Sequence, residues 1–263
     1  MLTLFLDDRR GKGLSVNTLS FYQGYLAKFF GRVAKPIVAV RKEDVTGFLN
    51  SLTCSAGGKH AYFRAIRAFY KWALEEGHVS EGLRISPPKV PKPLRYAVNV
   101  ADIARLLGAA EGTRDKLIVL LLADTGLRRA ELCSIEWADV DAERDTIRVW
   151  GKGAKQRVVR YGPQTKGLIE PWRQESGDTA GGSLLGLKPT GLQDVLKRLE
   201  ARTGIKCNAH AFRRTFACES VRNGLNVFYL QSLLGHSSLT MTRIYAEQVN
   251  SEDAIKAYKP IVT

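Results

Sequence analysis

Apolar residues recur every three or four positions along most of this chain, the spacing that places them on one face of a helix. In the clearest run the apolar positions are Leu19, Tyr22, Leu26, Phe29, Phe30 and Val33. The pattern predicts three helices in the N-terminal third, over residues 14–33, 42–52 and 58–76. Ser15 or Asn17 can cap the first of them, and Gly77 can end the third. We therefore expect this third of the chain to be helical.

The remaining two thirds keep the helical spacing with one interruption. We expect helices over residues 99–110, 114–124, 163–174, 191–202 and 251–258, a short one beginning near Leu127, and two or three between residues 208 and 245. Between residues 145 and 161, Ile147 and Val149 alternate with polar residues, and Val158 and Val159 follow the turn sequence GKGAK. This pattern predicts a β-hairpin. The expected fold class is mainly α with a small antiparallel β-sheet.

A proline-rich segment separates the two parts. Residues 84–96 contain four of the nine prolines, and proline cannot continue a helix and pushes its predecessor to extended geometry. We predict a first domain over residues 1–85, a stiff basic linker over 86–96, and a second domain over 97–263, with the boundary near residue 90.

The charge of the chain points to a polyanionic partner. Its 263 residues carry a formal net charge of +14, and 44% of them are hydrophobic, enough for a packed core. Residues 1–96 alone carry a net charge of +9. One face of the predicted third helix carries no acid before Glu75 and presents Lys59, His60, Arg64, Arg67 and Lys71. A solvated charged face is the alternative, but we favour contact with the phosphates of a nucleic acid.

Other classes of protein are excluded by what the sequence lacks. The four cysteines form no C-x-x-C pair, which argues against a zinc site, and nothing suggests a disulfide framework. The N-terminus does not resemble a signal peptide, and no run of 18 apolar residues could span a membrane. We expect a soluble, cytoplasmic protein without metal or cofactor.

Candidate chemistry is concentrated between Asn208 and Tyr245. His210 and Arg213 stand three apart, so both can reach one anion from the same face of a helix. His236 follows a glycine, and Tyr245 stands nine residues further on. Imidazoles, a guanidinium and a phenol suit phosphoryl transfer, in which catalysis is mostly positioning and charge stabilisation.

Upstream segments supply further groups of the same kind. In TGLRRAEL, residues 125–132, Arg128 and Glu131 are also three apart and can share a helix face. Lys152 stands between two glycines in the hairpin turn, from which its side chain could enter a cleft.

Taken together, TGLRRAEL, the GKG hairpin, HAFR, LGHSS and the final tyrosine resemble the signature of the tyrosine recombinases, the phage-integrase and Xer-like family. The motifs agree with that family in order and spacing throughout the C-terminal half. The resemblance implies a helical core-binding domain followed by an α-rich catalytic domain with a small antiparallel β-sheet. One departure is Arg214, where the family often has histidine; we do not expect it to affect the chemistry.

The resemblance also implies a role for each motif residue. Tyr245 would be the nucleophile that forms a 3′-phosphotyrosyl bond with DNA and releases a 5′-hydroxyl. Arg128 and Arg213 would clamp the non-bridging phosphate oxygens. Lys152 would protonate the leaving oxygen, with Lys155 as the alternative for that role.

The histidines and the acid complete the implied site. His210 would take or relay the tyrosine proton, since a phenol has a pKa near 10 and needs help to act as a nucleophile at neutral pH. His236 would bind a phosphate oxygen, and Glu131 would orient an arginine or a histidine. Tyr229 and Tyr258 compete with Tyr245, but neither has the nine-residue spacing from the Gly-His pair.

The implied function is site-specific recombination of double-stranded DNA. Four copies would assemble on two DNA sites and exchange strands through a Holliday junction, and Ile255 and Ala254 in the tail helix would dock on a neighbouring copy. The alternatives are a type IB topoisomerase, which relaxes DNA without exchanging partners, and a non-catalytic DNA-binding protein. The target sequence, the biological role and accessory proteins are not encoded in any motif.

Overall fold

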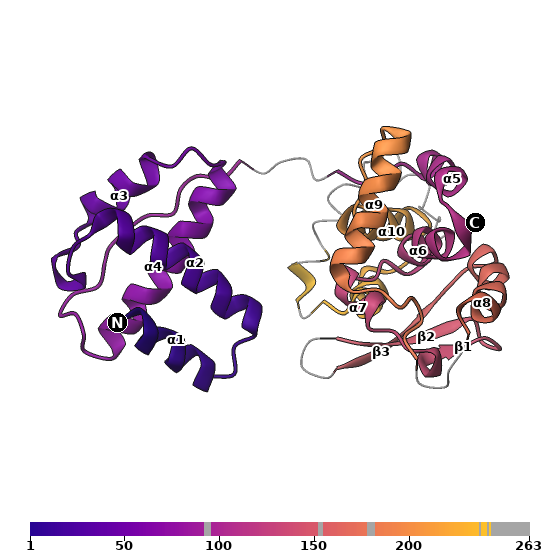
Figure 1. Ribbon diagram of the computed structural model, residues 1–263, viewed down its shortest axis with the longest axis horizontal. Helices are drawn as coiled ribbons and strands as arrows, with labels where there is room; N and C mark the ends of the chain where they lie inside the picture. The colour runs from indigo at the N-terminus through magenta and orange to yellow at the C-terminus, as the bar shows by residue number, and fades with distance from the viewer. Residues whose placement is uncertain (92–95, 152–154, 178–181, 237, 241, 243–263) are drawn as a thin grey trace, which may run out of the picture. The chain divides into compact units, whose positions relative to one another are not determined.

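The chain divides into two compact units, Met1–Leu94 and Arg95–Thr263, and the division falls inside the proline-rich segment. The computed structural model describes residues 1–91, 96–151, 155–177, 182–236, 238–240 and 242. Figure 1 shows the helices and strands of each unit.

The first unit is built from helices. Its elements are α1 (Leu2–Gly11), α2 (Val16–Val33), a 3-10 turn η1 (Ile37–Ala39), α3 (Lys42–Asn50) and α4 (Ala56–Glu75). The Ser15 hydroxyl accepts a hydrogen bond from the Thr18 amide at the start of α2, which confirms one of the two predicted caps. The helix α1 was not predicted; its sequence buries only Phe5 fully, too little for a recognisable apolar stripe.

Aromatic rings fill the interior of this unit. Phe5 and Phe69 are fully buried and meet edge to face, with 5.5 Å between their ring centroids. Phe5 also contacts Trp72 in the same geometry, and Phe29 contacts Phe48. Edge-to-face pairs stabilise a core beyond the area that they bury, so α1, α2, α3 and α4 are joined through their rings.

The second unit holds the rest of the elements. In chain order they are α5 (Val100–Ala109), α6 (Gly112–Thr125), α7 (Arg129–Cys133), η2 (Trp137–Asp139), β1 (Val140–Asp141), β2 (Thr146–Trp150), β3 (Gln156–Arg160), α8 (Pro163–Ser176), α9 (Pro189–Thr203), α10 (Ala209–Arg222) and α11 (Val227–Leu234). The expected fold class, mainly α with a small antiparallel sheet, is confirmed. The predicted helix over residues 251–258 lies outside the described residues.

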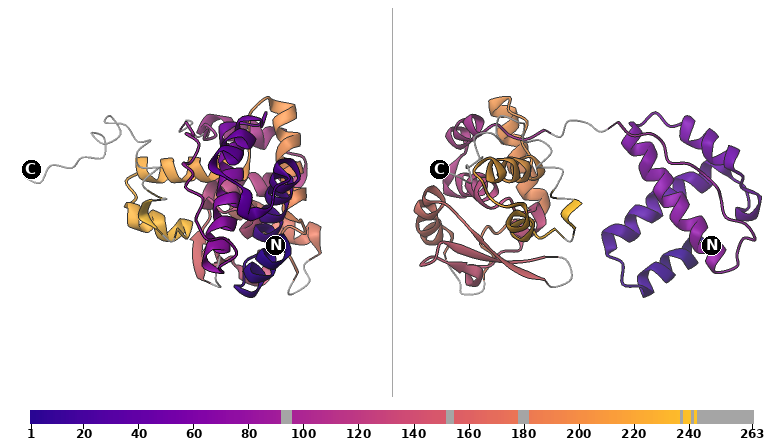
Figure 2. Two further views of the ribbon diagram at one scale, coloured as in Figure 1. Left: turned by 90° about the vertical axis from the view of Figure 1, so that its left-hand side faces the viewer. Right: turned by 180° about the vertical axis from the view of Figure 1, so that it is seen from behind.

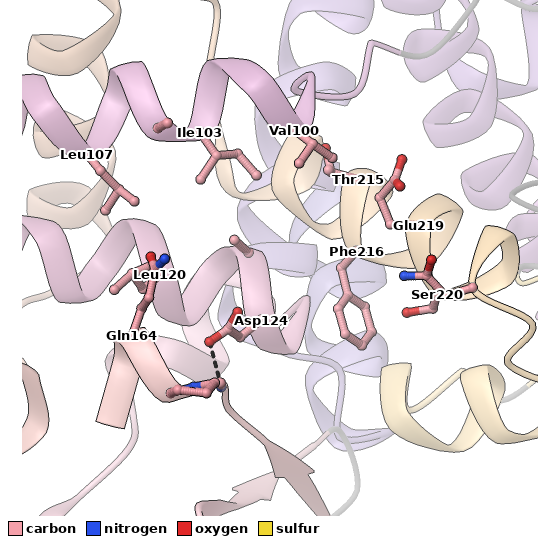
Figure 3. A pocket seen from close by; sticks show the side chains of 15 residues that line it. Val100, Ile103, Leu107, Leu120, Asp124, Gln164, Thr215, Phe216, Glu219 and Ser220 are labelled. Atoms are coloured by element: carbon pink, nitrogen blue, oxygen red, sulfur yellow. Dashed lines mark hydrogen bonds between the residues drawn. The ribbon is translucent and has the colours of Figure 1, made fainter. Parts of the chain in front are cut away.

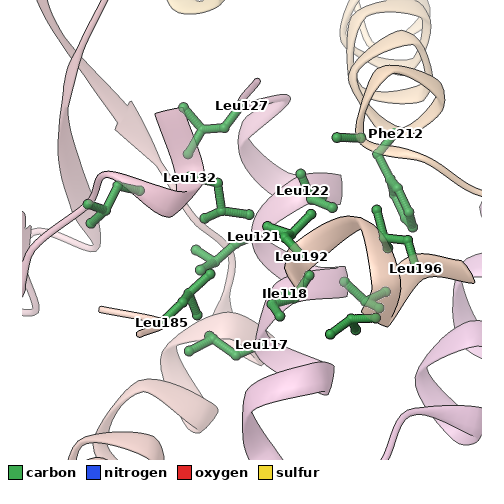
Figure 4. Packing of buried hydrophobic residues seen from close by; sticks show 14 of the residues in the cluster. Leu117, Ile118, Leu121, Leu122, Leu127, Leu132, Leu185, Leu192, Leu196 and Phe212 are labelled. Atoms are coloured by element: carbon green, nitrogen blue, oxygen red, sulfur yellow. The ribbon is translucent and has the colours of Figure 1, made fainter. Parts of the chain in front are cut away.

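Helix α6 is the centre of this unit. Residues 117–122 are buried without interruption, and a helix that is apolar on every side belongs in the interior. Leu117, Ile118, Leu121 and Leu122 pack against side chains of α7, α9 and α10 (Figure 4). The helix ends at Gly126, whose φ of 59° and close approach to the Phe216 ring leave no space for a side chain.

The sheet is antiparallel in the order β1-β2-β3 and lies along one side of the helices (Figure 2). The predicted hairpin is present as β2 and β3, in which Ile147 pairs with Val159 and Val149 with Arg157. The two-residue strand β1 was not predicted. Val159 is buried and Val158 is 55% exposed, so Arg157, two residues before Val159, is on the inward face.

No helix in the described part of the chain has both the length and the apolarity needed to cross a membrane.

Candidate functional site: a cationic cluster at the end of helix α11

The pair Arg128 and Glu131 stands at the beginning of α7. Arg128 is the residue that precedes the helix, and its backbone amide donates to Glu131 Oε2 at 2.9 Å. Its guanidinium Nη1 donates to Glu131 Oε1 at 2.7 Å. The two side chains meet as predicted, but Arg128 precedes the helix and does not lie on its face. The Glu131 carboxylate caps the start of the helix and binds the guanidinium of Arg128.

Helix α10 positions the second arginine. The helix begins after Asn208, whose side chain accepts from the Ala211 amide at 3.0 Å. Arg213 is only 2% exposed. Its Nη1 donates to the Gly126 carbonyl at 2.8 Å, and its Nη2 donates to the Leu234 carbonyl at 2.6 Å. A buried cation must be hydrogen-bonded, and these carbonyls hold the guanidinium against the ends of α6 and α11.

The C-terminus of α11 is where the charged side chains meet. The last carbonyls of a helix lack partners within the helix and carry partial negative charge. The Leu234 carbonyl accepts from Arg213 and, at 3.4 Å, from Arg128 Nη1. The Leu233 carbonyl accepts from Arg157 Nε at 2.7 Å. Arginines from three different elements therefore cap one helix end.

His236 follows this helix end directly. It is 8% exposed, and its Nδ1 forms a 2.8 Å hydrogen bond with the Thr242 hydroxyl. Burial lowers the pKa of His236 to about 4, and the charges of Arg213 and Arg128 contribute in the same direction. The ring is neutral at pH 7 and held at a fixed angle beside the two arginines.

His210 lies at the surface of α10, one turn before Arg213. Partial desolvation lowers its pKa, and the nearby charges of Arg214, Arg213 and Arg128 lower it further. A neutral imidazole can accept a proton, so the electrostatics fit a general base. Arg214 also donates to the Tyr96 carbonyl at 2.6 Å, which ties the start of the second unit to α10.

Arg157 belongs to this cluster although sequence reasoning did not select it. Its Nη2 donates to Glu131 Oε2 at 2.8 Å and its Nη1 to Glu131 Oε1 at 3.2 Å. Burial raises the pKa of Glu131, but the hydrogen bonds from Arg157 and Arg128 outweigh it, so the pKa is lowered. The signal available in the sequence was an arginine at an inward position of a strand.

The arrangement is suited to binding an oxyanion. Among the described residues, Arg128 and Arg157 both pair with the carboxylate of Glu131, and Arg213 binds the same helix end. Positive charge therefore gathers in a partly buried place, where electrostatic interactions are stronger than in water. No group of three or more His, Cys, Asp or Glu that could bind a metal ion occurs among the described residues.

Two of the predicted site residues, Lys152 and Tyr245, lie outside the described residues, as does Tyr258. Lys155 is exposed at the base of the hairpin, where its carbonyl accepts from the Gly151 amide at 2.8 Å. Tyr229, the other competing tyrosine, is on α11 and 67% exposed. The structure therefore brings together Arg128, Glu131, His210, Arg213 and His236, and does not test the others.

The predicted DNA-binding face is on the surface of α4. Arg64, Arg67 and Lys71 are exposed and line a groove of about 410 Å³ together with Phe21 and His60 of the same unit. The Arg64 guanidinium lies 5.6 Å from the centroid of the Phe21 ring. Lys59 is half-buried near the start of the helix.

Comparison with known proteins agrees with this organisation. The model of the phage integrase family matches residues 97–252. The chain is 34% identical to the tyrosine recombinase XerA of Saccharolobus solfataricus over 253 residues, which cover 90% of this chain and 84% of that protein. It is 30% identical to XerA of Pyrococcus horikoshii, covering 96% and 91%.

Solved structures give the same result for the fold. The crystal structure of a lambda integrase (75–356) dimer bound to a COC′ core site aligns with 99% of this chain and 97% of that one, with a TM-score of 0.79 at 19% identity. The family match covers more than half of the chain, and the sequence relatives match almost all of it. The chain belongs to the phage integrase family, the tyrosine-type site-specific recombinases.

Proposed function

We propose that this protein cuts and rejoins double-stranded DNA at specific sites, with Tyr245 as the nucleophile. The phenol oxygen attacks a backbone phosphorus and forms a 3′-phosphotyrosyl bond while the 5′-oxygen leaves. The observation that carries the proposal is the convergence of Arg128, Arg213 and His236 at the end of α11 in a chain of this family. The bond conserves the energy of the phosphodiester, so rejoining needs no metal or cofactor.

Each described group has a role in this reaction that its environment supports. Arg128 and Arg213 neutralise the charge that develops on the non-bridging oxygens. His236, neutral at pH 7, donates a hydrogen bond to one of these oxygens, and His210 accepts the proton of the tyrosine. Lys152 protonates the leaving oxygen, with Lys155 as the alternative.

DNA binding is shared by both parts of the chain. Residues 1–85 act as the core-binding domain, joined by residues 86–96 to a catalytic domain over 97–263. In the first of these, Lys59, Arg64, Arg67 and Lys71 contact phosphates. One of the similar solved structures is a lambda integrase tetramer bound to a Holliday junction, which supports a tetramer of this protein exchanging strands through the same intermediate.

The decisive experiment traps the covalent intermediate. Duplexes from an inverted-repeat library, each nicked close to its centre, are incubated without metal with wild-type protein or with Tyr245→Phe. We expect a covalent protein–DNA band on a denaturing gel with the wild type and none with Tyr245→Phe. A band that persists in Tyr245→Phe and is lost in Tyr229→Phe would refute the assignment of Tyr245.

The tail is proposed to join neighbouring copies. A cavity of about 580 Å³ lies between α5, α6 and α10, with Val100, Ile103, Leu107 and Phe216 on its walls (Figure 3). None of the described residues of the cationic cluster lines this cavity. Its apolar walls suit Ile255 and Ala254. If deletion of residues 250–263 left junction formation intact, this assignment would be wrong.

A further inference from the structure

Arg157 occupies a position that an apolar residue would normally fill. Side chains alternate along β3, and Arg157 is on the same face as the buried Val159 and opposite the buried Val149. Its side chain is 10% exposed. A charge facing inward is costly unless it is paired and hydrogen-bonded, so the contacts of this guanidinium indicate why the position is cationic.

Those contacts use all three nitrogens of the guanidinium. Nη1 donates to Glu131 Oε1 at 3.2 Å, and Nη2 donates to Glu131 Oε2 at 2.8 Å. Nε donates to the Leu233 carbonyl at 2.7 Å. The same two carboxylate oxygens accept from the amide and the guanidinium of Arg128. Arg157 thus fixes the carboxylate that in turn fixes Arg128.

Two glycines lie close to the side chain of Arg157. A Cβ placed on Gly235 would lie 3.0 Å from Arg157 Nη1 and 3.3 Å from its Cδ. A Cβ placed on Gly151, at the base of the hairpin turn, would lie 3.7 Å from the same nitrogen, in ordinary van der Waals contact. Arg157 therefore connects the hairpin, the start of α7 and the turn between α11 and His236.

We propose that Arg157 is a positioning residue for strand cleavage: through Glu131 it sets the guanidinium of Arg128, and through the Leu233 carbonyl it sets the turn that carries His236. The described contacts support the positioning of Arg128 and His236 by Arg157. Its effect on strand cleavage rests on the proposed function. Arg157 is not assigned a contact with the DNA phosphate, because its side chain is only 10% exposed and its described hydrogen bonds are directed at Glu131 and Leu233. Lysine cannot replace it, since an ammonium lacks the planar fork that binds both carboxylate oxygens.

The first measurement needs no DNA and tests the geometry alone. Side-chain ¹⁵N spectra report the order of arginine Nε–H groups, and the Arg128 signal is assigned by its loss in Arg128→Lys. We expect Arg128 to be ordered in the wild type and to become mobile in Arg157→Met. Arg160→Met is the matched control, because Arg160 stands on the outer, exposed face of the same strand. An Arg128 signal unchanged in Arg157→Met would overturn the proposal.

The second measurement tests the consequence for cleavage. On a nicked duplex selected with the wild type, the rate of covalent-adduct formation at saturating DNA should fall on the order of 10²-fold in Arg157→Met, the loss typical of a small misplacement of a catalytic group. The dissociation constant for DNA should change by less than about threefold, because Arg157 is not proposed to contact DNA and its loss removes no interaction with the uncleaved duplex. A loss confined to the dissociation constant would contradict a positioning role.

A double-mutant cycle separates positioning from a general loss of structure. If Arg157 acts through Glu131, then Glu131→Gln and Arg157→Met should slow cleavage to similar extents and the double variant should be little slower than either, because residues that act as a unit are non-additive. Losses that multiply would overturn the proposal. If Arg157→Met does not fold, Arg157→Lys, which keeps the charge and loses the fork, takes its place in every arm.

The two proposals fail in different ways. Mobility of Arg128 in Arg157→Met without any Tyr245-dependent adduct in the wild type would refute the proposed function and support the positioning of Arg128. A Tyr245-dependent adduct whose rate is the same in wild type and Arg157→Met would refute the role of Arg157 and leave the proposed function intact.

Discussion

The two units of this protein place their polar groups in opposite ways. Within the described residues, every ring–ring contact lies between Phe5 and His78, in the first unit. The buried polar and charged side chains in the described part of the chain all lie in the second unit, among them Asp115, Glu131, Arg213 and His236. The first interior is aromatic and uncharged; the second is mostly aliphatic and encloses charges.

The difference indicates how each unit can work. An interior of interlocking rings gives a rigid body whose cations, such as Arg64 and Arg67, stay on the surface and meet a partner there. The second unit instead uses its interior to hold charges in defined directions, which requires each buried group to be paired. Substitutions in the interior should therefore affect stability in the first unit, and both chemistry and pH-dependent stability in the second. Substitutions of surface cations in the first unit should affect binding alone, and four predictions test these differences.

The largest effect is expected at Arg213. Arg213→Ala should slow covalent-adduct formation about 10³-fold, because the loss of one donor to a developing oxyanion has this size. Arg222→Ala is the control: it removes an exposed arginine of the same helix that pairs with Glu219. The measurement is a single-turnover rate on a nicked duplex. Equal losses in the two variants would mean that positive charge on α10, rather than the buried guanidinium, is what matters.

A purely structural effect is expected at Phe69. Phe69→Ala should destabilise the first unit by about 3–5 kcal/mol, the usual cost of deleting a buried ring. Trp72 is the only tryptophan before residue 95 and packs against Phe69, so it supplies the part of the fluorescence change on urea unfolding that comes from this unit, beside Trp137, Trp150 and Trp172 of the second unit. Leu74→Ala, at a position 42% exposed on the same helix, serves as control. A matching shift in the unfolding of the second unit would contradict separate cores.

The second unit should lose stability in mild acid because of His236. Its folded pKa, about 4, lies below the usual 6.5, so between these pH values the unfolded chain binds more protons and stability falls as pH falls. At pH 5 the loss relative to pH 7 should be on the order of 2 kcal/mol. It is measured by chemical denaturation at each pH, and His236→Gln should show a smaller dependence. An identical pH dependence in that variant would exclude His236 as the cause.

The smallest effect is expected on the surface of the first unit. Removing Arg64 and Arg67 together should weaken duplex binding about tenfold and reduce the slope of log K against log salt by roughly 2, one unit for each phosphate that is no longer neutralised. Lys12→Ala, which removes a lysine paired with Asp8 on α1, is the control. Folding of the first unit should not change. An unaltered salt slope would show that this face of α4 is only solvated.

The elements predicted from sequence are those whose pattern is strong and local. Helices α2 and α4 have long apolar stripes and serine caps at Ser15 and Ser55, so their periodicity is unambiguous. Strand β1 has two half-buried residues and exists because it pairs with β2. No local sequence pattern predicts β1, because its pairing with β2 depends on the folded hairpin.

The same limit applies to the site. The pair Arg128 and Glu131 was predicted because the two residues are three apart, although the helix they share begins between them. For the hairpin, the sequence predicts Val158 and Val159 as the returning apolar pair; the structure exposes Val158 and turns Arg157 inward. Its partner Glu131 is 26 residues away in sequence, a contact that depends on how β3 packs against α11 and α7.

The capped end of α11 has a consequence for the timing of catalysis. Arg128 and Arg213 donate to the Leu234 carbonyl, and Arg157 donates to the Leu233 carbonyl, so these contacts are supplied by the protein itself. The free-energy cost of bringing these mutually repelling guanidinium groups together is therefore met when the chain folds, and it does not recur each time the protein binds DNA. A phosphate that reaches the cluster meets dipoles and charges already oriented, so little reorganisation remains for the chemical step.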